Sequence, residues 1–552
     1  MYLFRIFYSL LPLRNPIGFG GSDLLILAIA VLMVVLLLAK AWLTPYLFKL
    51  ASQTRLCMVT LFALAIVLRL ALLPHSPEPI PSGADDFGYL LLGDTIAHFR
   101  FANPPHVLHQ FFESVFILQQ HTYASIYPLA QGFVLALINP WFGVLLSSGA
   151  FCALCYWMLR AWVSPIWALT GGLLTIIQFG PLSTWVNSYW GGYVSACAGC
   201  LVFGALPRLR KGPQLRNGIL LGLGLSLQIL SRPFEATFLA LAIVLWLAAT
   251  FLLKQPWKPL AAALAPLSFA LLLVLLQNKA VTKSWTTMPY VLSRYQYGVP
   301  TTLTFQPNPI PHRQLTAEQE FDYKAQSAIH GSHPETFQSY TTRLIYRFRY
   351  LRFFLLPPLF LAVLFIRRHL WALGIILLFA LGTNFYPYFY PHYIAALTCL
   401  FILLSIAGLQ RMDNASRQLV LVLCFASFAF WFGVYALADP AVFAVTDYQS
   451  WNYINTGDPQ GRVAINSQLR NSPGQQLVFV RYAPFHRFEE WVHNDADIEH
   501  SQTVWANDLG SDENRKLLHY YPNRTPWLLE PDVHPPALKP YSTDTGIFET
   551  VH

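Results

Sequence analysis

Long apolar runs separated by short polar linkers dominate the pattern of this chain. The runs Leu24–Leu38, Phe62–Leu73, Leu239–Leu253 and Leu260–Leu276 approach or reach the ~20 residues that a helix needs to cross a bilayer. We therefore expect an α-helical polytopic membrane protein with about twelve transmembrane helices. The predicted crossings lie near residues 22–40, 56–73, 141–159, 165–181, 191–206, 217–231, 235–253, 259–277, 351–366, 370–389, 393–410 and 418–438.

Basic residues cluster in alternate linkers between the apolar runs, as in Arg208/Arg210/Lys211 and Arg367/Arg368. Because Lys and Arg are enriched in cytoplasmic linkers, this side is predicted to be cytoplasmic. The longer polar segments then face the other way, so we expect the protein to act on its extracytoplasmic face. These segments are the loops 74–140 and 278–350 and the tail after about residue 439.

The tail differs from the rest of the chain because charged residues return and apolar runs become short. Gln476–Tyr482 and Val504–Leu509 have the pattern of strands, Asp512–Tyr520 that of a helix, and Pro526–Glu530 that of an extended segment. We predict a multi-span membrane domain, 1–438, followed by a small extracytoplasmic α/β domain, 439–552.

Composition supports a bilayer environment. Hydrophobic residues make up 55% of the chain and charged residues only 11%, against roughly a quarter in soluble domains. The net charge of +9 lies in short linkers rather than in a basic domain, so no nucleic-acid partner is expected. All seven cysteines lie in or beside apolar segments, which favours packing residues over a disulfide framework.

The sharpest chemical signal is a pair of adjacent aspartates just outside the second predicted crossing. The segment predicts a helix that begins near Asp85 and places Asp85 and Tyr89 on one side, four residues apart. Asp85 and Asp86 could act as a general base or bind a metal ion. They could equally form the first turn of an interfacial helix, where acids favour the positive end of the helix dipole. The residues alone leave both interpretations open.

An acidic pair followed by a tyrosine, in the first large external loop, resembles the Asp-Glu-x-x-Tyr signature of GT-C fold glycosyltransferases. This polyprenol-phosphate-sugar-dependent class includes protein mannosyltransferases and aminoarabinose transferases. Tyr127-Pro128-Leu129 resembles the His/Tyr-Pro-Pro-Leu element of the same group, and the many spans, long second loop and external tail also match. Two positions depart from the pattern, because Asp86 replaces Glu and Leu129 replaces the second Pro. The subfamily and acceptor therefore stay open.

The resemblance implies transfer of a sugar from a polyprenyl-phosphate-linked donor to an acceptor glycan, lipid or protein. Asp85 and Asp86 match the acid that, in this family, deprotonates the acceptor or helps to hold a divalent cation such as Mg²⁺ or Mn²⁺. A base is needed because an acceptor hydroxyl is a poor nucleophile until its proton is removed. The resemblance to bacterial members implies an inner membrane with a periplasmic active face, and an endoplasmic reticulum location stays open.

The leaving phosphate needs cationic partners on the same face of the membrane. Arg232 lies in an external turn between two spans, Arg294 in the second large loop, and His392 at another external helix end. We predict that these three residues bind the donor phosphate, since an Arg side chain presents a fixed fork of donors that suits phosphate. Each Arg also has a structural interpretation, either as a contact to lipid headgroups or, for Arg232 and Glu235, as a local ion pair.

The predicted substrate pocket comprises Tyr89, Asn187, Trp190, Glu235 and Tyr393. Glu235 enters an apolar span at once, where an ionisable side chain is costly and marks a functional candidate. Asn187 and Trp190 lie in an aromatic, glycine-rich stretch that offers a polar group and a stacking face to a sugar or prenyl chain. Aromatic belts are also common at membrane interfaces, which is the simpler interpretation of that stretch.

Two other functions fit a polytopic chain. A transporter or lipid flippase would carry charges along an intramembrane path and be built from two related halves, but the sequence has no internal repeat. A non-catalytic assembly or sensor subunit would carry its function in the tail. The acidic pair and the long external loops favour the transferase.

Overall fold

The computed structural model describes residues 28–35, 44–251, 257–331, 335–354, 367–437 and 461–542, except positions 485, 487 and 488. The chain forms two compact units, each built from three segments. The membrane unit comprises residues 1–79, 141–272 and 335–456, and the α/β unit comprises residues 80–140, 273–334 and 457–552. Most of the two predicted external loops therefore belongs to the same unit as the end of the tail.

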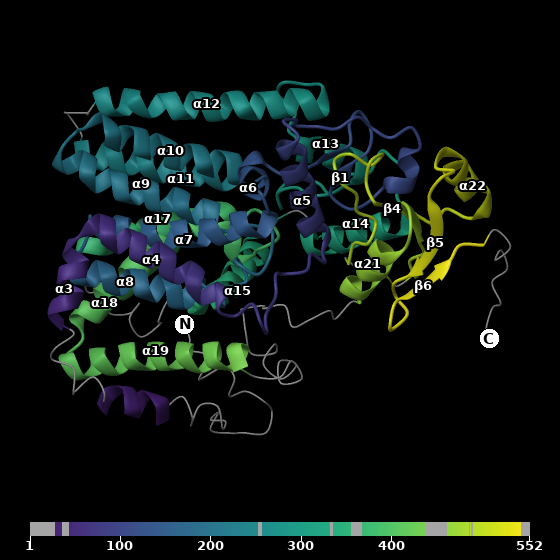
Figure 1. Cartoon of the computed structure of the whole chain (residues 1–552). Helices are drawn as coiled ribbons and strands as arrows, with labels where there is room; N and C mark the ends of the chain where they lie inside the picture. Colours follow the sequence, from purple (N-terminus) through teal and green to yellow (C-terminus); the bar gives the residue numbers. More distant parts are fainter. Residues whose placement is uncertain are drawn as a thin grey trace. The chain divides into compact units, whose positions relative to one another are not determined.

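Helices of the membrane unit occupy most of the predicted apolar runs (Figure 1). Pro140, Pro165 and Pro233 each stand at the first position of a helix, where the missing N–H costs nothing because the first-turn amides have no intrahelical partner. The helices are α3 (Thr44–Ser52), α4 (Thr54–Leu70), α7 (Pro140–Leu159), α8 (Pro165–Phe179), α9 (Tyr193–Lys211), α10 (Leu215–Ser231), α11 (Pro233–Phe251), α12 (Trp257–Thr282), α15 (Phe337–Phe354), η2 (Arg367–His369), α17 (Leu370–Thr383), η3 (Pro391–Leu397), α18 (Thr398–Arg411) and α19 (Asn414–Leu437).

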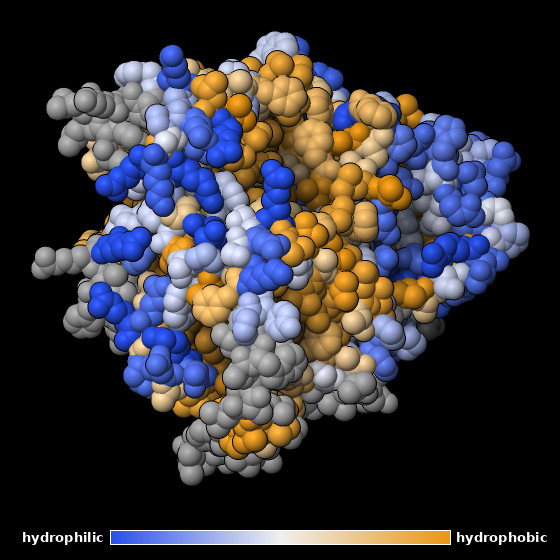
Figure 2. Space-filling model, turned by 60° about the vertical axis from the view of Figure 1, so that its left-hand side comes forward, coloured by the Kyte–Doolittle hydropathy of each residue, from blue (hydrophilic) through white to orange (hydrophobic). Residues whose placement is uncertain are grey.

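Within the described residues, four helical segments are long and apolar enough to cross a membrane, or five if the bent pair α3 and α4 counts as one span. They are α7, α12, α19 and the continuous segment Pro391–Arg411, and shorter apolar helices accompany them. Figure 2 shows broad apolar areas on one face of the molecule. Large apolar side chains of α12, such as Leu264 and Phe269, are exposed. These features make the chain an integral membrane protein. The count of twelve crossings stays a prediction, since most of 22–40 and 351–366 lies outside the described residues.

One close approach in the membrane unit fixes the position of η3. A Cβ atom added at Gly199 of α9 would lie 1.8 Å from the carbonyl oxygen of Ala396. Only glycine therefore lets the backbone of η3 pack directly on α9. This contact holds the segment that carries His392 and Tyr393 against the helix that follows Trp190.

The α/β unit contains a four-stranded sheet with the order β4-β3-β5-β6. β3 (Gln476–Val480) lies parallel to both β4 (Thr503–Asn507) and β5 (Thr525–Glu530), and β6 (Ala537–Pro540) closes the sheet antiparallel to β5. α22 (Ser511–Tyr520) connects β4 to β5, as parallel strands require a crossover. The two predicted strands, the helix and the extended segment of the tail are all present, and α21 (Arg462–Asn471) precedes them.

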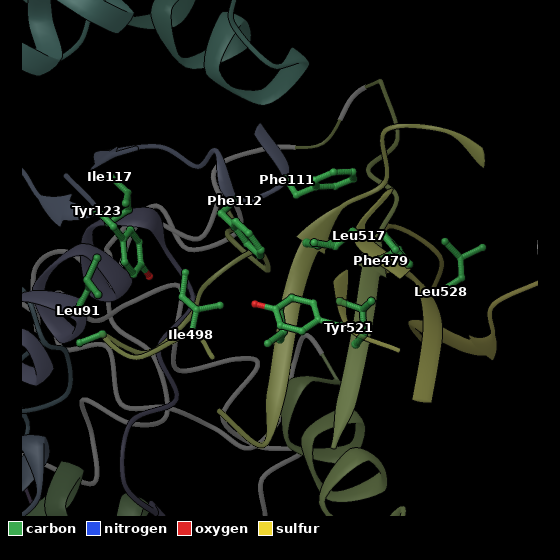
Figure 3. Close-up of a cluster of buried hydrophobic side chains, with 14 residues drawn as sticks. Leu91, Phe111, Phe112, Ile117, Tyr123, Phe479, Ile498, Leu517, Tyr521 and Leu528 are labelled. Carbon is green, nitrogen blue, oxygen red and sulfur yellow. The ribbon is translucent and has the colours of Figure 1, made fainter. Parts of the chain in front are cut away.

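Segments far apart in the sequence complete this sheet's core (Figure 3). Leu91, Phe112 and Tyr123, from the first predicted external loop, share one buried cluster with Phe479 and Leu517 of the tail. Burial of each such side chain contributes about 1.5–3 kcal/mol, so the first loop and the tail stabilise each other. The loop supplies α5 (Ala84–Ala97), η1 (His109–Phe112), the short strands β1 (Ile117–Leu118) and β2 (Ala124–Ser125), and α6 (Leu129–Leu135).

The second predicted loop joins the same unit through a buried ion pair. It forms α13 (Pro289–Tyr297) and α14 (Ala317–His330). Arg313, between these helices, donates to the carboxylate of Glu113 in the first loop. The hydroxyl of Tyr297 donates to the other oxygen of Glu113 at 2.9 Å, and Gln319 lies 3.4 Å from the same oxygen. One buried carboxylate thus connects three parts of the unit.

Candidate active site

The acidic pair lies in the first turn of α5, the helix predicted to begin near Asp85. Asp86 is buried, with 5% of its surface exposed, and accepts a hydrogen bond from the backbone N–H of Ser82 at 3.3 Å. Gly83, at the N-cap, supplies no side-chain cap. Asp86 therefore fixes the start of the helix, while both acids gain from the positive end of its dipole.

Asp85 is half-buried and receives the phenolic hydroxyl of Tyr127 on its Oδ1. The ring of Tyr127 stacks on Tyr89 with centroids 4.0 Å apart, and a Cβ at Gly88 would come within 2.6 Å of the same ring. Gln277 of α12 donates to the backbone oxygen of Tyr127 at 2.8 Å. The acidic pair and the Tyr127-Pro128-Leu129 motif, which lie far apart in the sequence, are therefore in contact, and the Tyr127 hydroxyl fixes the orientation of the Asp85 carboxylate.

Asp322, on α14, is a site residue that sequence analysis missed. It is buried, and burial raises the pKa of its carboxyl to about 7, with a lowering contribution from Gln326 and a further raising contribution from the charge of Asp85. The side chain of Gln326 donates to Asp322 at 2.8 Å. A carboxyl that titrates near neutral pH beside another acid is typical of functional sites. Its sequence signal is a four-residue period of buried polar side chains, Glu318, Asp322, Gln326 and His330.

This pKa predicts how stability depends on pH. An unfolded Asp loses its proton near pH 3.8, whereas folded Asp322 keeps its proton until about pH 7. Between these values the unfolded state binds fewer protons, so stability falls as pH rises, by at most about 1.4 kcal/mol per pH unit for one group. We expect Asp322→Asn to flatten this fall, measured as the unfolding temperature of the purified protein between pH 4.5 and 7.5.

The asparagine keeps an oxygen that can accept the hydrogen bond from Gln326. The difference between this variant and the native protein therefore reports only the titration of the Asp322 carboxyl. The matched control is Glu320→Gln, an exposed acid on the same helix that pairs with Lys324. It should preserve the slope of the native protein. An identical slope in Asp322→Asn and the native protein would show that Asp322 does not titrate in this range.

A second buried acid pair supports α14. Glu490 accepts from the Tyr482 hydroxyl at 2.8 Å and from the backbone N–H of Val492 at 2.9 Å. Burial, and next the charge of Glu490, raises the pKa of Glu318 well above its usual range. His486 lies 3.9 Å from Glu318. Glu318 of α14 thus lies buried near His486 and Glu490 of the tail.

In the membrane unit, several predicted residues form one aromatic and cationic cluster. Arg232 lies between α10 and α11, 3.6 Å from Glu235, and its guanidinium carbon is 4.4 Å from the ring centroid of Tyr393. His392 contacts the rings of Tyr393 and Trp190, with centroids 4.8 and 5.9 Å apart. The Nε1 of Trp190 is buried and has no hydrogen-bond partner among the described residues. The local Arg232–Glu235 pair was one of the two interpretations open from sequence, and the rings around it were not predicted as its partners.

Asn187 lies apart from these contacts. Its amide donates to the carbonyl oxygen of Ser183 at 2.8 Å and accepts from Arg69 at 3.0 Å. Arg69 also donates to the carbonyls of Ser76 and Pro77 and lies over the ring of Trp141. The structure thus gives Asn187 a role in the fold, and its role in a substrate pocket stays a prediction.

Arg294 belongs to the α/β unit, on α13. It donates to the carbonyl oxygens of Pro300 at 3.0 Å and Thr301 at 3.1 Å. These bonds fix the chain after α13, where Gly298 adopts a left-handed conformation with φ 76°. Phosphate binding by Arg294 stays a prediction.

The surroundings of Asp85 and Asp86 bear on the predicted metal binding. Their characterised partners are a phenol and a backbone N–H, and the described part of the chain holds no group of three or more His, Cys, Asp or Glu side chains placed to bind a metal ion. Metal binding by Asp85 and Asp86 therefore stays a prediction.

No protein-family model matches the sequence, and no match to a curated protein is found. Among solved structures, the chain is similar to the apo form of an Archaeoglobus fulgidus oligosaccharyltransferase, with 12% identity, a TM-score of 0.38, and coverage of 86% of this chain and 69% of that chain. It is also similar to the A. fulgidus oligosaccharyltransferase AglB in complex with an inhibitory peptide and a dolichol-phosphate, with 12% identity, a TM-score of 0.34, and coverage of 89% and 70%. At these values the likeness assigns no residue role to this chain.

Proposed function

We propose that this chain is a membrane glycosyltransferase of the GT-C type. It would move a sugar from a polyprenyl-phosphate-linked donor to an acceptor glycan, lipid or protein at the periplasmic face of a bacterial inner membrane. The observation that carries the proposal is the contact between Asp85 and the Tyr127 hydroxyl. It joins the two motifs that resemble this family and gives the acid a fixed orientation.

The proposed chemistry assigns the proton transfer to Asp85. Its carboxylate accepts the proton of the acceptor hydroxyl as that oxygen forms a bond to the anomeric carbon of the sugar. The bond between the anomeric carbon and the donor phosphate oxygen breaks, and polyprenyl phosphate leaves with the electron pair. Tyr127 orients Asp85, and Asp86 maintains the helix start through Ser82.

The cationic cluster of the membrane unit is proposed to bind the donor phosphate. Arg232 carries the positive charge and lies over the ring of Tyr393, which contacts His392, and His392 contacts Trp190. A charged fork of donors suits the negative charge that grows on phosphate as the sugar leaves. Glu235 balances the Arg232 charge when no donor is bound.

Donor cleavage tests this function directly. The full chain, reconstituted in lipid nanodiscs, would be given radiolabelled polyprenyl-phosphate sugars and cell-envelope extract as the acceptor source. Release of polyprenyl phosphate together with label in the acceptor fraction is expected. Movement of intact donor between leaflets without cleavage would instead establish a flippase and overturn the transferase.

Arg232→Gln is expected to raise KM for the lipid-linked donor about 10- to 100-fold, because hydrogen bonds to a charged group contribute about 1.5–3 kcal/mol. The measurement is initial rate against donor concentration. Arg232→Lys should give a KM between those of the native protein and Arg232→Gln, since Lys keeps the positive charge but lacks the planar set of guanidinium N–H donors. The matched control is Arg216→Gln, an exposed arginine at the other end of α10.

Removal of Arg232 also leaves Glu235 without this partner, so loss of folding must be separated from loss of binding. The double variant Arg232→Gln/Glu235→Gln removes the uncompensated acid. An unchanged KM in this double variant, with normal folding, would contradict the phosphate-binding role.

A further inference from the structure

The chain turns back on itself just after α12. This turn lies beside the end of the helix, where its apolar stretch gives way to polar residues. The apolar stretch of α12 ends at Leu276 and is followed by Gln277-Asn278-Lys279. The side chain of Asn278 donates to the carbonyl oxygen of Trp285 at 3.0 Å, and Thr282 donates to that of Thr287 at 3.0 Å. Trp285 therefore lies beside the last turns of α12, where its apolar surface gives way to polar residues.

Aromatic and basic side chains gather at this level. Trp285 is 50% exposed, and the Nζ of Lys279 lies 5.9 Å from its ring centroid. Lys283, in the turn, is also exposed. Tryptophan is enriched where the hydrocarbon of a bilayer meets the headgroups, and lysines near that level attract anionic lipids.

α13 follows directly and shows two different faces. Ser293 and Gln296 are buried, whereas Val291 and Tyr295, four residues apart on the other side, are 39% and 59% exposed. Val281, near the end of α12, shares a hydrophobic cluster with Tyr297 of α13. The exposed Val291 and Tyr295 thus belong to a helix that follows directly after the candidate membrane span α12.

We propose that Trp285 and the Val291–Tyr295 face of α13 rest in the headgroup region of the bilayer that α12 crosses, with Lys279 and Lys283 contacting anionic phospholipids. The partner is the lipid surface, chosen because Trp285 and two lysines lie at the end of a candidate span and α13 follows that end directly along the chain. The inference is independent of the proposed sugar transfer.

Nitroxide accessibility tests this placement. Val291→Cys and Tyr295→Cys, each spin-labelled in the full chain, would be examined in nanodiscs of phosphatidylcholine and phosphatidylglycerol. The native cysteines are all buried, and labelling of the native protein measures their background. We expect collision with oxygen to exceed collision with Ni-EDDA by several-fold, because oxygen partitions into lipid and the nickel complex stays in water.

The matched control is Lys324→Cys on α14, whose side chain is 69% exposed, and its label should favour Ni-EDDA. Nickel accessibility at position 291 equal to that at position 324 would overturn the proposal. Exclusion of both reagents would also overturn it, because a protein surface would then cover the face. Replacing Lys279 and Lys283 together by Gln should abolish any deeper immersion of the position-291 label caused by phosphatidylglycerol; persistence of that effect would contradict the lipid contact of the lysines.

Discussion

Asp85→Asn is expected to reduce the rate of sugar transfer by about 10²- to 10⁴-fold, the usual contribution of a positioned general base. The amide can still accept the Tyr127 hydroxyl, so the fold of α5 should survive while the proton acceptor is lost. The measurement is transfer at saturating donor, with folding verified by unfolding temperature. Because the proposed loss concerns the chemical step, kcat should fall with little change in KM for the donor.

Two further variants separate the role of Asp85 from the effect of losing an acidic side chain. Asp86→Asn keeps an oxygen for the Ser82 N–H and should cost much less activity than Asp85→Asn. Glu320→Gln removes an exposed acid of the same unit and should leave the rate unchanged. Equal losses in the Asp85 and Asp86 variants would contradict the separate roles assigned to them, and full activity of Asp85→Asn would remove Asp85 from the chemistry.

Arg313→Met is expected to destabilise the α/β unit by about 3–5 kcal/mol, because it leaves the carboxylate of Glu113 buried without its cationic partner. The Glu113 side chain is only 8% exposed, so water cannot readily compensate. Limited proteolysis in denaturant would measure the change through cleavage within residues 457–542. The double variant Glu113→Gln/Arg313→Met should recover part of the loss, since it removes the stranded charge.

The cysteines provide an internal reference for this experiment. All seven lie in the membrane unit, so a thiol-reactive dye reports the unfolding of that unit. Arg313→Met should lower the proteolysis midpoint and shift the thiol midpoint much less. A proteolysis midpoint equal to that of the native protein would show that the ion pair contributes no net stability.

The sequence predicted elements better than it predicted their partners. Apolar runs predicted most helices of the membrane unit, and the patterns of Gln476–Tyr482 and Val504–Leu509 predicted two strands. That these strands are parallel neighbours is shown only by the structure. The sequence did not predict that the loop and the tail share a core, because the burial of Leu91 and Phe479 in one cluster depends on contacts that no local period encodes. The spacing of apolar residues identifies the buried face of a helix or strand, but it does not identify the segment that packs against that face.

The candidate site shows the same limit for polar residues. The spacing of Arg232 and Glu235 predicted their contact as one interpretation, since both lie in one turn. Asn187 and Arg294 looked available for a substrate, yet both bind backbone carbonyls. The sequence does not show which backbone carbonyls are left without a hydrogen bond in a helix or sheet, because this depends on the tertiary fold. Asp322 was not predicted, because a polar helix face in a loop ordinarily faces water, whereas the Asp322 side of α14 is buried.

The core shared by the first loop and the tail has a consequence for biogenesis. His106 and Tyr521, which hydrogen-bond at 3.1 Å, are separated by 415 positions. The loop that carries Asp85 therefore leaves the ribosome long before the strands that complete its support. Until residues 476–530 have been synthesised and moved to the side where this loop lies, apolar residues such as Phe112 lack their partners. We therefore expect α5 to reach its final position late in the maturation of the chain, after the tail has been synthesised.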